Sequence, residues 1–206
     1  MAKKYVDFRG VDNLVAAEVI NDDNEVSGGY TTSEVFPIAG VGEISKTTET
    51  SSATKYYDNL AAIVINSEGS DEITLTCSIP DLATQAKLCG KMIDETTGAM
   101  IDGESGPKYF ALGYRFKKTD GTYRYVWRLK GRFGIPDETS ATEDDGTDSN
   151  GMELVYTGIS TTHKFTKGGK PAKAVVVDDT ATSKADISAF FDAVTDPDKL
   201  KAKGGE

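Results

Sequence analysis

Apolar and polar side chains alternate along residues 108–133, and this period of two predicts a β-hairpin. Asp120-Gly121 lies in the middle of the segment and is a strong signal for a two-residue turn, because glycine readily takes a positive φ. Pairing outward from this turn predicts three apolar pairs on one face: Phe116 with Tyr125, Tyr114 with Trp127, and Leu112 with Leu129. The other face is predicted to be cationic, with the basic residues Arg115, Lys117, Arg124, Arg128, Lys130 and Arg132.

The same alternation, together with short apolar runs, predicts further strands along the chain. They cover residues 13–20, 43–49, 56–67, 72–78, 152–165 and 174–177, with residues 134–142 as another candidate. A turn signal at residues 68–71 predicts that the segments on either side of it form a second hairpin. Residues 21–42 are rich in Asn, Asp, Gly, Ser and Thr, and we expect them to form a long loop or arm.

Two short helices are predicted beside these strands. Asp81 is placed to cap the first helix, and Gly90 lies near its end. Ser183 is placed to cap the second, which carries an apolar stripe formed by Ile187, Phe190, Phe191 and Val194. The pattern therefore indicates a mainly β fold, a β-sandwich or barrel with one or two short flanking α-helices and long loops or arms. We expect a single domain over residues 1–198 and a flexible C-terminal tail over residues 199–206.

Charge is distributed unevenly along the 206 residues. The formal net charge is −10, which argues against a simple nucleic-acid binder. Residues 108–132 nevertheless carry a net charge of +7, so the rest of the chain carries −17. Patches of opposite charge favour self-association, because they fix the orientation of two copies. The alternative is that these Lys and Arg residues lie on a solvated strand face.

The sequence contains no recognisable catalytic, cofactor-binding or metal-binding pattern. Cys77 and Cys89 lack CxxC spacing and His163 is the single histidine, which argues against a zinc site. The acidic segment 143–151 does not match an EF-hand in either alignment of its glycines, and a solvated loop is the simpler interpretation. No nucleophile or orienting group is evident beside His163, so we do not expect an enzyme.

The mean hydropathy is −0.38, and no apolar run approaches the roughly 20 residues that a membrane helix needs. The first residues have no apolar stretch typical of a secretory signal, so we expect synthesis in a cytoplasm.

The chain resembles the major tail proteins, or tail-tube proteins, of phages with long non-contractile tails and Gram-positive hosts. The resemblance runs over nearly the whole chain, and no single segment is diagnostic. It rests on the order of the segments Phe8-Arg9-Gly10-Val11-Asp12-Asn13-Leu14, Glu43-Ile44-Ser45-Lys46-Thr47, Tyr56-Tyr57-Asp58-Asn59, Tyr109-Phe110-Ala111-Leu112-Gly113-Tyr114-Arg115, Tyr123-Arg124-Tyr125-Val126-Trp127-Arg128, Ile135-Pro136-Asp137-Glu138-Thr139 and Phe190-Phe191-Asp192-Ala193-Val194.

This resemblance implies a β-sandwich with a flanking helix, hexameric rings that stack into a hollow tube, and a location in the virion tail. DNA would pass through the lumen to the host without specific binding. The implied partners are further copies of the chain, a tape-measure protein, the baseplate or distal tail protein and a tail terminator, with no cofactor and no membrane insertion.

Two interface hypotheses follow from the charge pattern and the resemblance together. The first pairs the cationic hairpin face with an acidic patch on a neighbouring subunit, and its residues are Arg124, Arg128, Lys130, Arg132, Glu143, Asp144, Asp145 and Asp148. The second places the loop at 21–42 against the adjacent ring, with the candidate residues Asp22, Asp23, Tyr30, Glu34 and Phe36. The competing class is a β-sandwich binding or adhesion module, against which the missing secretory signal weighs.

Overall fold

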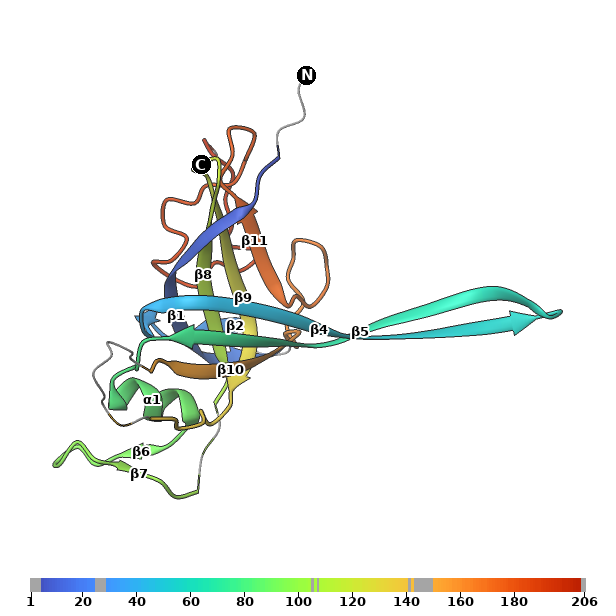
Figure 1. The fold of residues 1–206 in the computed structure, drawn as a ribbon. Coiled ribbons are helices and arrows are strands. Elements are labelled where there is room, and N and C mark those ends of the chain that lie inside the picture. Colours follow the sequence, from blue (N-terminus) through green and yellow to red (C-terminus); the bar gives the residue numbers. More distant parts are fainter. Residues whose placement is uncertain are drawn as a thin grey trace.

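The computed structural model describes residues 5–24, 29–104, 106, 108–140, 142 and 150–204. The fold is mainly β, as the sequence predicts, and is built on one antiparallel sheet of nine strands (Figure 1). Its main path runs β2-β1-β8-β9-β10-β5-β4, while β3 pairs with β1 and β11 pairs with β9. The strands are β1 (Phe8–Asp22), β2 (Tyr30–Thr32), β3 (Phe36–Pro37), β4 (Val41–Tyr57), β5 (Leu60–Cys77), β8 (Phe110–Lys118), β9 (Tyr123–Phe133), β10 (Met152–Ile159) and β11 (Ala174–Asp178).

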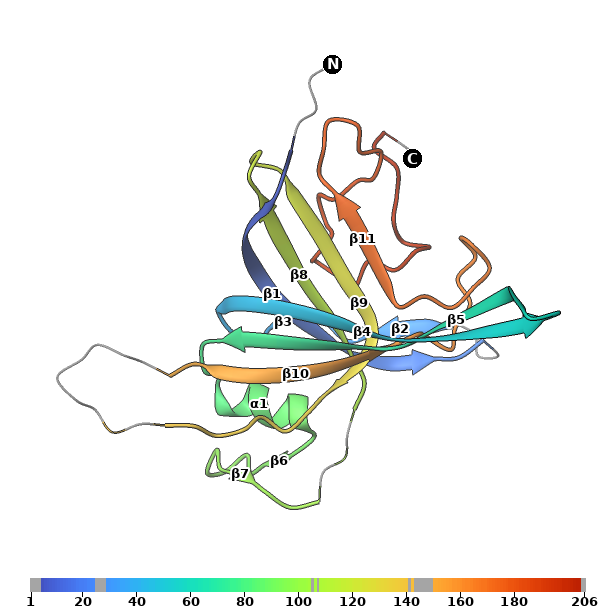
Figure 2. The same cartoon turned by 45° about the vertical axis from the view of Figure 1, so that its right-hand side comes forward.

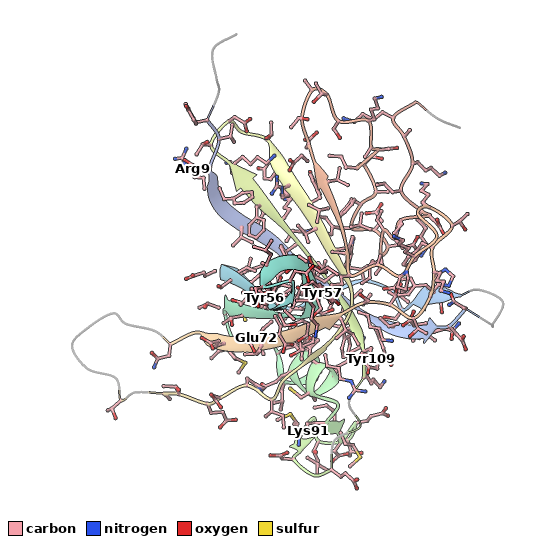
Figure 3. All side chains as sticks on the ribbon, turned by 90° about the vertical axis from the view of Figure 1, so that its right-hand side faces the viewer. Arg9, Tyr56, Tyr57, Glu72, Lys91 and Tyr109 are labelled. Carbon is pink, nitrogen blue, oxygen red and sulfur yellow. The ribbon has the colours of Figure 1, made fainter. Side chains whose placement is uncertain are left out.

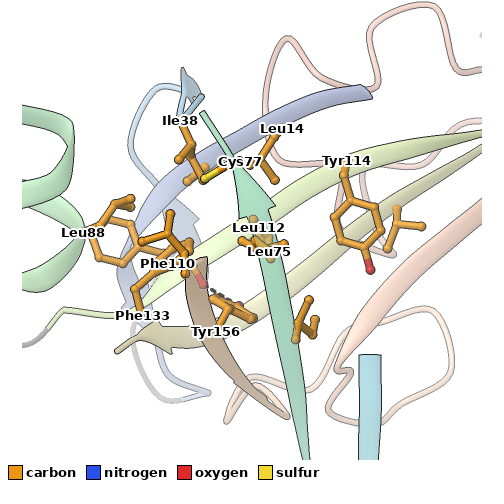
Figure 4. Close-up of a cluster of buried hydrophobic side chains, with 14 residues drawn as sticks. Leu14, Ile38, Leu75, Cys77, Leu88, Phe110, Leu112, Tyr114, Phe133 and Tyr156 are labelled. Atoms are coloured by element: carbon orange, nitrogen blue, oxygen red, sulfur yellow. Dashed lines mark hydrogen bonds between the residues drawn. The ribbon is translucent and has the colours of Figure 1, made fainter. Parts of the chain in front are cut away.

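The sheet bends so that its β10-β5-β4 part crosses in front of β1, β8 and β9 (Figures 1 and 2). Side chains from both parts meet in the first core, which is closed at one end by Leu88 (Figure 4). Within it the Tyr156 hydroxyl donates to the Phe110 carbonyl at 2.8 Å. The two parts therefore pack as the layers of a β-sandwich, and over the described residues the path runs between edges at β2 and β4 without closing into a barrel.

A second core lies on the other face of β1, β8 and β9 and is covered by β11 and the C-terminal segment. The helix predicted after Ser183 is wrong, because residues 188–194 form successive turns. Phe190 and Val194 are nevertheless buried in this core, and the indole nitrogen of Trp127 donates to the Phe190 carbonyl at 2.8 Å. The apolar stripe thus marks core residues but not the backbone conformation that buries them.

The helix predicted at Asp81 is confirmed as α1 (Leu82–Cys89), which is the one helix among the described residues. The Asp81 carboxylate accepts the Thr84 N–H at 2.8 Å, and Gly90 ends the helix with a φ of 67°. A small hairpin of β6 (Met92–Ile93) and β7 (Met100–Ile101) follows the helix.

The predicted hairpin at 108–133 is confirmed as β8 and β9, but the predicted register is wrong by one residue. Tyr114 lies opposite Val126, and Trp127 lies opposite Gly113. The turn holds three residues, because the Lys118 N–H donates to the Thr122 carbonyl at 2.8 Å. A shift of one residue in the pairing moves the side chains of one strand to the opposite face of the hairpin. Apolar side chains therefore lie on both faces, and each face packs against a core. The predicted cationic face does not form.

The second predicted hairpin also turns at a different place. Residues 68–71 do not reverse the chain, because β5 continues through them as one strand of 18 residues. The reversal lies at Asp58 and Asn59, whose φ values of 51° and 61° suit a tight hairpin turn. Gly69 and Ser70 instead form a bulge opposite Glu49 in β4.

The described residues of the segment 21–42 contact their own subunit. The segment contains β2 and β3, and Tyr30 is buried with its hydroxyl donating to the Leu129 carbonyl. At the other terminus Ala202 bridges to Ala185, so residues 199–204 also contact the body.

The remaining strand predictions differ from the structure mainly in length. β1 extends beyond the predicted 13–20, and β10 ends at Ile159 instead of reaching residue 165. The described residues of 134–142 form no strand, whereas β11 matches its prediction closely.

Candidate assembly surface

The most prominent surface is the outer half of the β4–β5 hairpin, residues 50–68, called the arm here. It extends away from the body as a two-stranded ribbon (Figure 1). Every residue from 49 to 69 is exposed, although the two strands pair from Thr50 opposite Glu68 to Tyr57 opposite Leu60, with one shift of register between Lys55 and Tyr56. The ribbon therefore has backbone order without a core of its own.

Large apolar side chains are concentrated on the arm. Leu60 is 71% exposed, Tyr56 67% and Val64 59%, and Tyr57, Ile63 and Ile65 are also exposed. The cross-strand pairs place Ile63 and Ile65 on one face together with Ala53 and Lys55. Figure 3 looks along the arm and shows the two tyrosines at its end.

An arm of this kind is unfavourable for an isolated chain. A single two-stranded hairpin is only marginally stable in water. Its unpaired strand edges and grouped apolar side chains are both templates for association. Burying one Leu or Ile side chain contributes about 1.5–3 kcal/mol, so contact with a partner surface would stabilise the arm substantially.

A buried carboxylate fixes the base of the arm to the body. Asp71 is 4% exposed and accepts a hydrogen bond from the Thr48 hydroxyl at 2.8 Å. Three cations surround it: Arg128 at 3.1 Å, Lys46 at 3.4 Å and Lys173 at 3.8 Å. Burial alone would raise the pKa of Asp71, but the Thr48 hydroxyl and these cations together hold it below its usual value.

Other basic residues of the predicted interface also have partners within the subunit. Arg124 binds Asp178 through two nitrogens at 2.7 and 2.9 Å, and Lys118 reaches the same carboxylate at 2.8 Å. The Arg124 guanidinium is the main reason why the pKa of Asp178 lies well below its usual range. Lys130 pairs with Asp22.

The other residues of the predicted charge interface are Arg132 and four acidic residues. Arg132 stacks over the Tyr109 ring at 4.2 Å. The four acidic residues Glu143, Asp144, Asp145 and Asp148 lie outside the described residues. Contact between the basic residues and a neighbouring acidic patch stays a prediction, and Arg124, Arg128 and Lys130 would enter it already paired.

The second hypothesis places the loop at 21–42 against the adjacent ring, and the structure puts its five candidate residues in different environments. Asp22 accepts the backbone N–H groups of Thr162 and His163, and burial opposes the lowering of its pKa that these bonds and Lys130 cause. Tyr30 is buried, and burial raises its pKa. Phe36 packs edge-on against Phe110 at 6.4 Å between ring centroids, with the Lys87 ammonium over its ring. The Asp23 carbonyl lies 3.2 Å from the His163 ring nitrogen, while Glu34 is exposed.

The sequence-based reasoning missed the arm. It predicted one strand over residues 56–67 followed by a turn at 68–71, whereas the chain reverses at Asp58 and Asn59, inside the predicted strand. The available signal was the Ser/Thr-rich segment at 47–54, whose polar residues offer the apolar run no complementary core.

Comparison with known proteins adds no assignment, since no family model matches the chain and no curated protein sequence matches it. Among the described residues no group of three His, Cys, Asp or Glu side chains is arranged to hold a metal ion. No helix in the described part of the chain is long and apolar enough to cross a membrane.

Proposed function

We propose that this chain is a tail-tube protein that assembles as hexameric rings, stacked into the tube of a long non-contractile phage tail. The observation that carries the proposal is the exposed apolar arm on an otherwise well-packed domain. An arm that has no core of its own gains stability by contacting another copy, which is what a self-assembling structural protein requires. The resemblance of the sequence to tail-tube proteins supplies the kind of assembly.

In this role the tube would conduct DNA from the capsid to the host. A conduit must not retain DNA, and contacts between phosphates and Lys or Arg would do so. The net charge of −10 disfavours such contacts, and Arg124, Arg128 and Lys130 are already paired with carboxylates of their own subunit. Assembly would involve a tape-measure protein, the baseplate or distal tail protein and a terminator, and the protein would reside in the virion after synthesis in the host cytoplasm.

A variant with a shortened arm tests the proposal. Residues 51–67 are replaced by Asn-Gly, which joins the paired residues Thr50 and Glu68 by a two-residue turn. Sedimentation over a range of concentrations and negative-stain electron microscopy compare this variant with the complete chain. We expect rings or tubes from the complete chain and a folded monomer from the variant.

Two results would contradict the proposal. One is assembly of the shortened variant at the same concentration as the complete chain. The other is a complete chain that stays monomeric at high concentration even when a tail-initiation complex is added. The second result together with binding of the exposed arm to a different protein or a glycan would favour the adhesion module.

A further inference from the structure

The arm joins the body at an interruption of the β4–β5 ladder. β10 pairs with β5 as far as Gly158 opposite Asp71, so β10 supports the ribbon only up to that point. Directly beyond it, Glu49 of β4 faces two residues of β5, Gly69 and Ser70. A bulge of this kind leaves one residue unpaired, disrupts the ladder locally and bends the strand. The ribbon is therefore able to bend at its base, where it leaves the body (Figure 1).

One lysine of the body reaches this bulge. The Lys173 ammonium donates a hydrogen bond to the Gly69 carbonyl. It also lies 4.0 Å from the Glu68 carboxylate and 3.8 Å from that of Asp71, so it contacts β5 on both sides of the bulge. Among the hydrogen bonds and ion pairs of the described residues, those of Lys173 are the only ones that join a side chain of the body to residues 50–69.

The backbone of Lys173 is held by its neighbours in the body. The Leu129 N–H donates to the Lys173 carbonyl at 2.9 Å, and pairing of β11 with β9 begins at the next residue, Ala174. On the other side, the Thr161 N–H donates to the Ala172 carbonyl at 3.1 Å, and the Thr161 hydroxyl accepts the Ala172 N–H at 3.1 Å. The ammonium therefore extends to the bulge from an ordered part of the body.

We propose that the bulge is a hinge and that Lys173 sets the direction of the arm in the free subunit. The buried carboxylate of Asp71 lies on the fixed side of this hinge, and the exposed ribbon 50–68 is the part that moves. In the proposed function, on which only this consequence rests, a preset direction would reduce the conformational freedom that the arm loses on contacting another copy.

Distances between spin labels on the arm and on the body measure the direction of the arm. One label is placed at Val64→Cys on the arm, and the other at Val176→Cys on β11 or at Ile101→Cys on β7, all of which are exposed positions. The native Cys77 and Cys89 are buried, so the introduced cysteines are the ones that react. Doubly labelled chain is diluted with unlabelled chain, which restricts the measured distances to one subunit. We expect a narrow distance distribution for both pairs.

Loss of the lysine should release the arm. Lys173→Met keeps a side chain of similar length but removes its charge and its hydrogen bond, so it should broaden both distributions. Lys46→Met is the matched control, because Lys46 also lies beside Asp71, at 3.4 Å, but forms no hydrogen bond or ion pair with residues 50–69. The distributions should stay narrow in this control.

Removal of the bulge provides a second measurement. Deleting Gly69 leaves Ser70 alone opposite Glu49, so the two strands pair one to one through the base of the arm. Without the bulge the arm should keep a narrow distribution even when Lys173→Met is also present.

Three results would overturn the inference. They are broad distributions in the chain with native Lys173, unchanged widths in Lys173→Met, and equal broadening by Lys46→Met, which would assign the effect to the charge around Asp71. A broad distribution after deletion of Gly69 would contradict the position of the hinge. All these measurements use the dilute subunit, so a chain that never associates would contradict the proposed function alone, and failure of the hinge would leave that function standing.

Discussion

Asp71 is the residue on which attachment of the arm to the body depends most. Its carboxylate is 4% exposed and neutralises part of the charge of Arg128, whose side chain is 13% exposed. We expect Asp71→Asn to lower the free energy of unfolding by about 2 kcal/mol at pH 7, because a nearly buried guanidinium loses its counter-ion. Urea denaturation of the monomer measures this difference, and Glu72→Gln at the exposed neighbouring position is the control.

The effect of Asp71→Asn should also depend on pH. The pKa of Asp71 is lower in the folded state than in the unfolded chain, despite its burial. Its charge therefore stabilises the fold above the unfolded pKa of about 4, and this contribution is lost as the pH falls through the folded-state pKa. The difference between the two proteins should shrink in acid, and a constant difference from pH 7 to pH 3 would contradict the assignment.

Turn chemistry at single residues explains where the sequence-based register was wrong. Asp120-Gly121 predicts a turn correctly, but the Asp120 carboxylate accepts both the N–H and the hydroxyl of Thr122. These bonds accompany a three-residue loop, in which Gly121 takes a φ of 86°. The apolar pattern does not distinguish the two registers, because residues on both faces of β9 contribute to a core.

At the scale of elements, the apolar stripe after Ser183 shows why periodicity can predict burial without predicting conformation. In a helix the Phe190 carbonyl would accept the N–H of Val194. Here it accepts the Trp127 indole at 2.8 Å and the Thr195 hydroxyl at 3.0 Å. The Trp127 donor reaches this carbonyl through the tertiary fold, and the Thr195 donor reaches it through a local side-chain hydrogen bond. The hydrophobic periodicity of the sequence indicates neither bond.

The arm is the element whose stability should change most on assembly. In a dilute monomer we expect the amides of residues 50–68 to exchange with solvent much faster than those of β9, because no core covers the ribbon. In the assembled state their protection should rise, while that of β9 stays high. Hydrogen exchange followed by mass spectrometry measures both states. Strong protection of the arm in the monomer would show that it is stable alone and would remove the physical reason for its association.

At the scale of the whole molecule, the sequence correctly predicts the β-rich class and one of the two expected helices, whereas the external shape depends on where the chain turns between β4 and β5. Asp58 and Asn59 have the positive φ values that the turn requires, but Glu68-Gly69-Ser70-Asp71 is the stronger turn signal in the sequence. Because residues 68–71 form a bulge within β5 instead of a turn, residues 50–68 extend from the body and do not pack within it. A choice between two turn sites thus decides whether the chain has an arm.

The arm's apolar side chains should contribute to assembly and not to the fold. Leu60, Ile63 and Ile65 are all at least 48% exposed, so replacing the three with Ser should change the free energy of unfolding of the monomer by less than about 0.5 kcal/mol. The same replacement should weaken association at least about a hundredfold, since each apolar side chain loses more than about 1 kcal/mol of burial.

Sedimentation equilibrium and urea denaturation of the same triple variant measure these two effects. A control with Ser at Ile20, Ile101 and Val176 removes equally exposed apolar groups from three other strands and should assemble normally. Equal weakening by both variants would indicate association through nonspecific hydrophobic contact. A loss of monomer stability confined to the arm variant would indicate that the arm packs on its own subunit, because a side chain that contacts nothing within the fold cannot stabilise it.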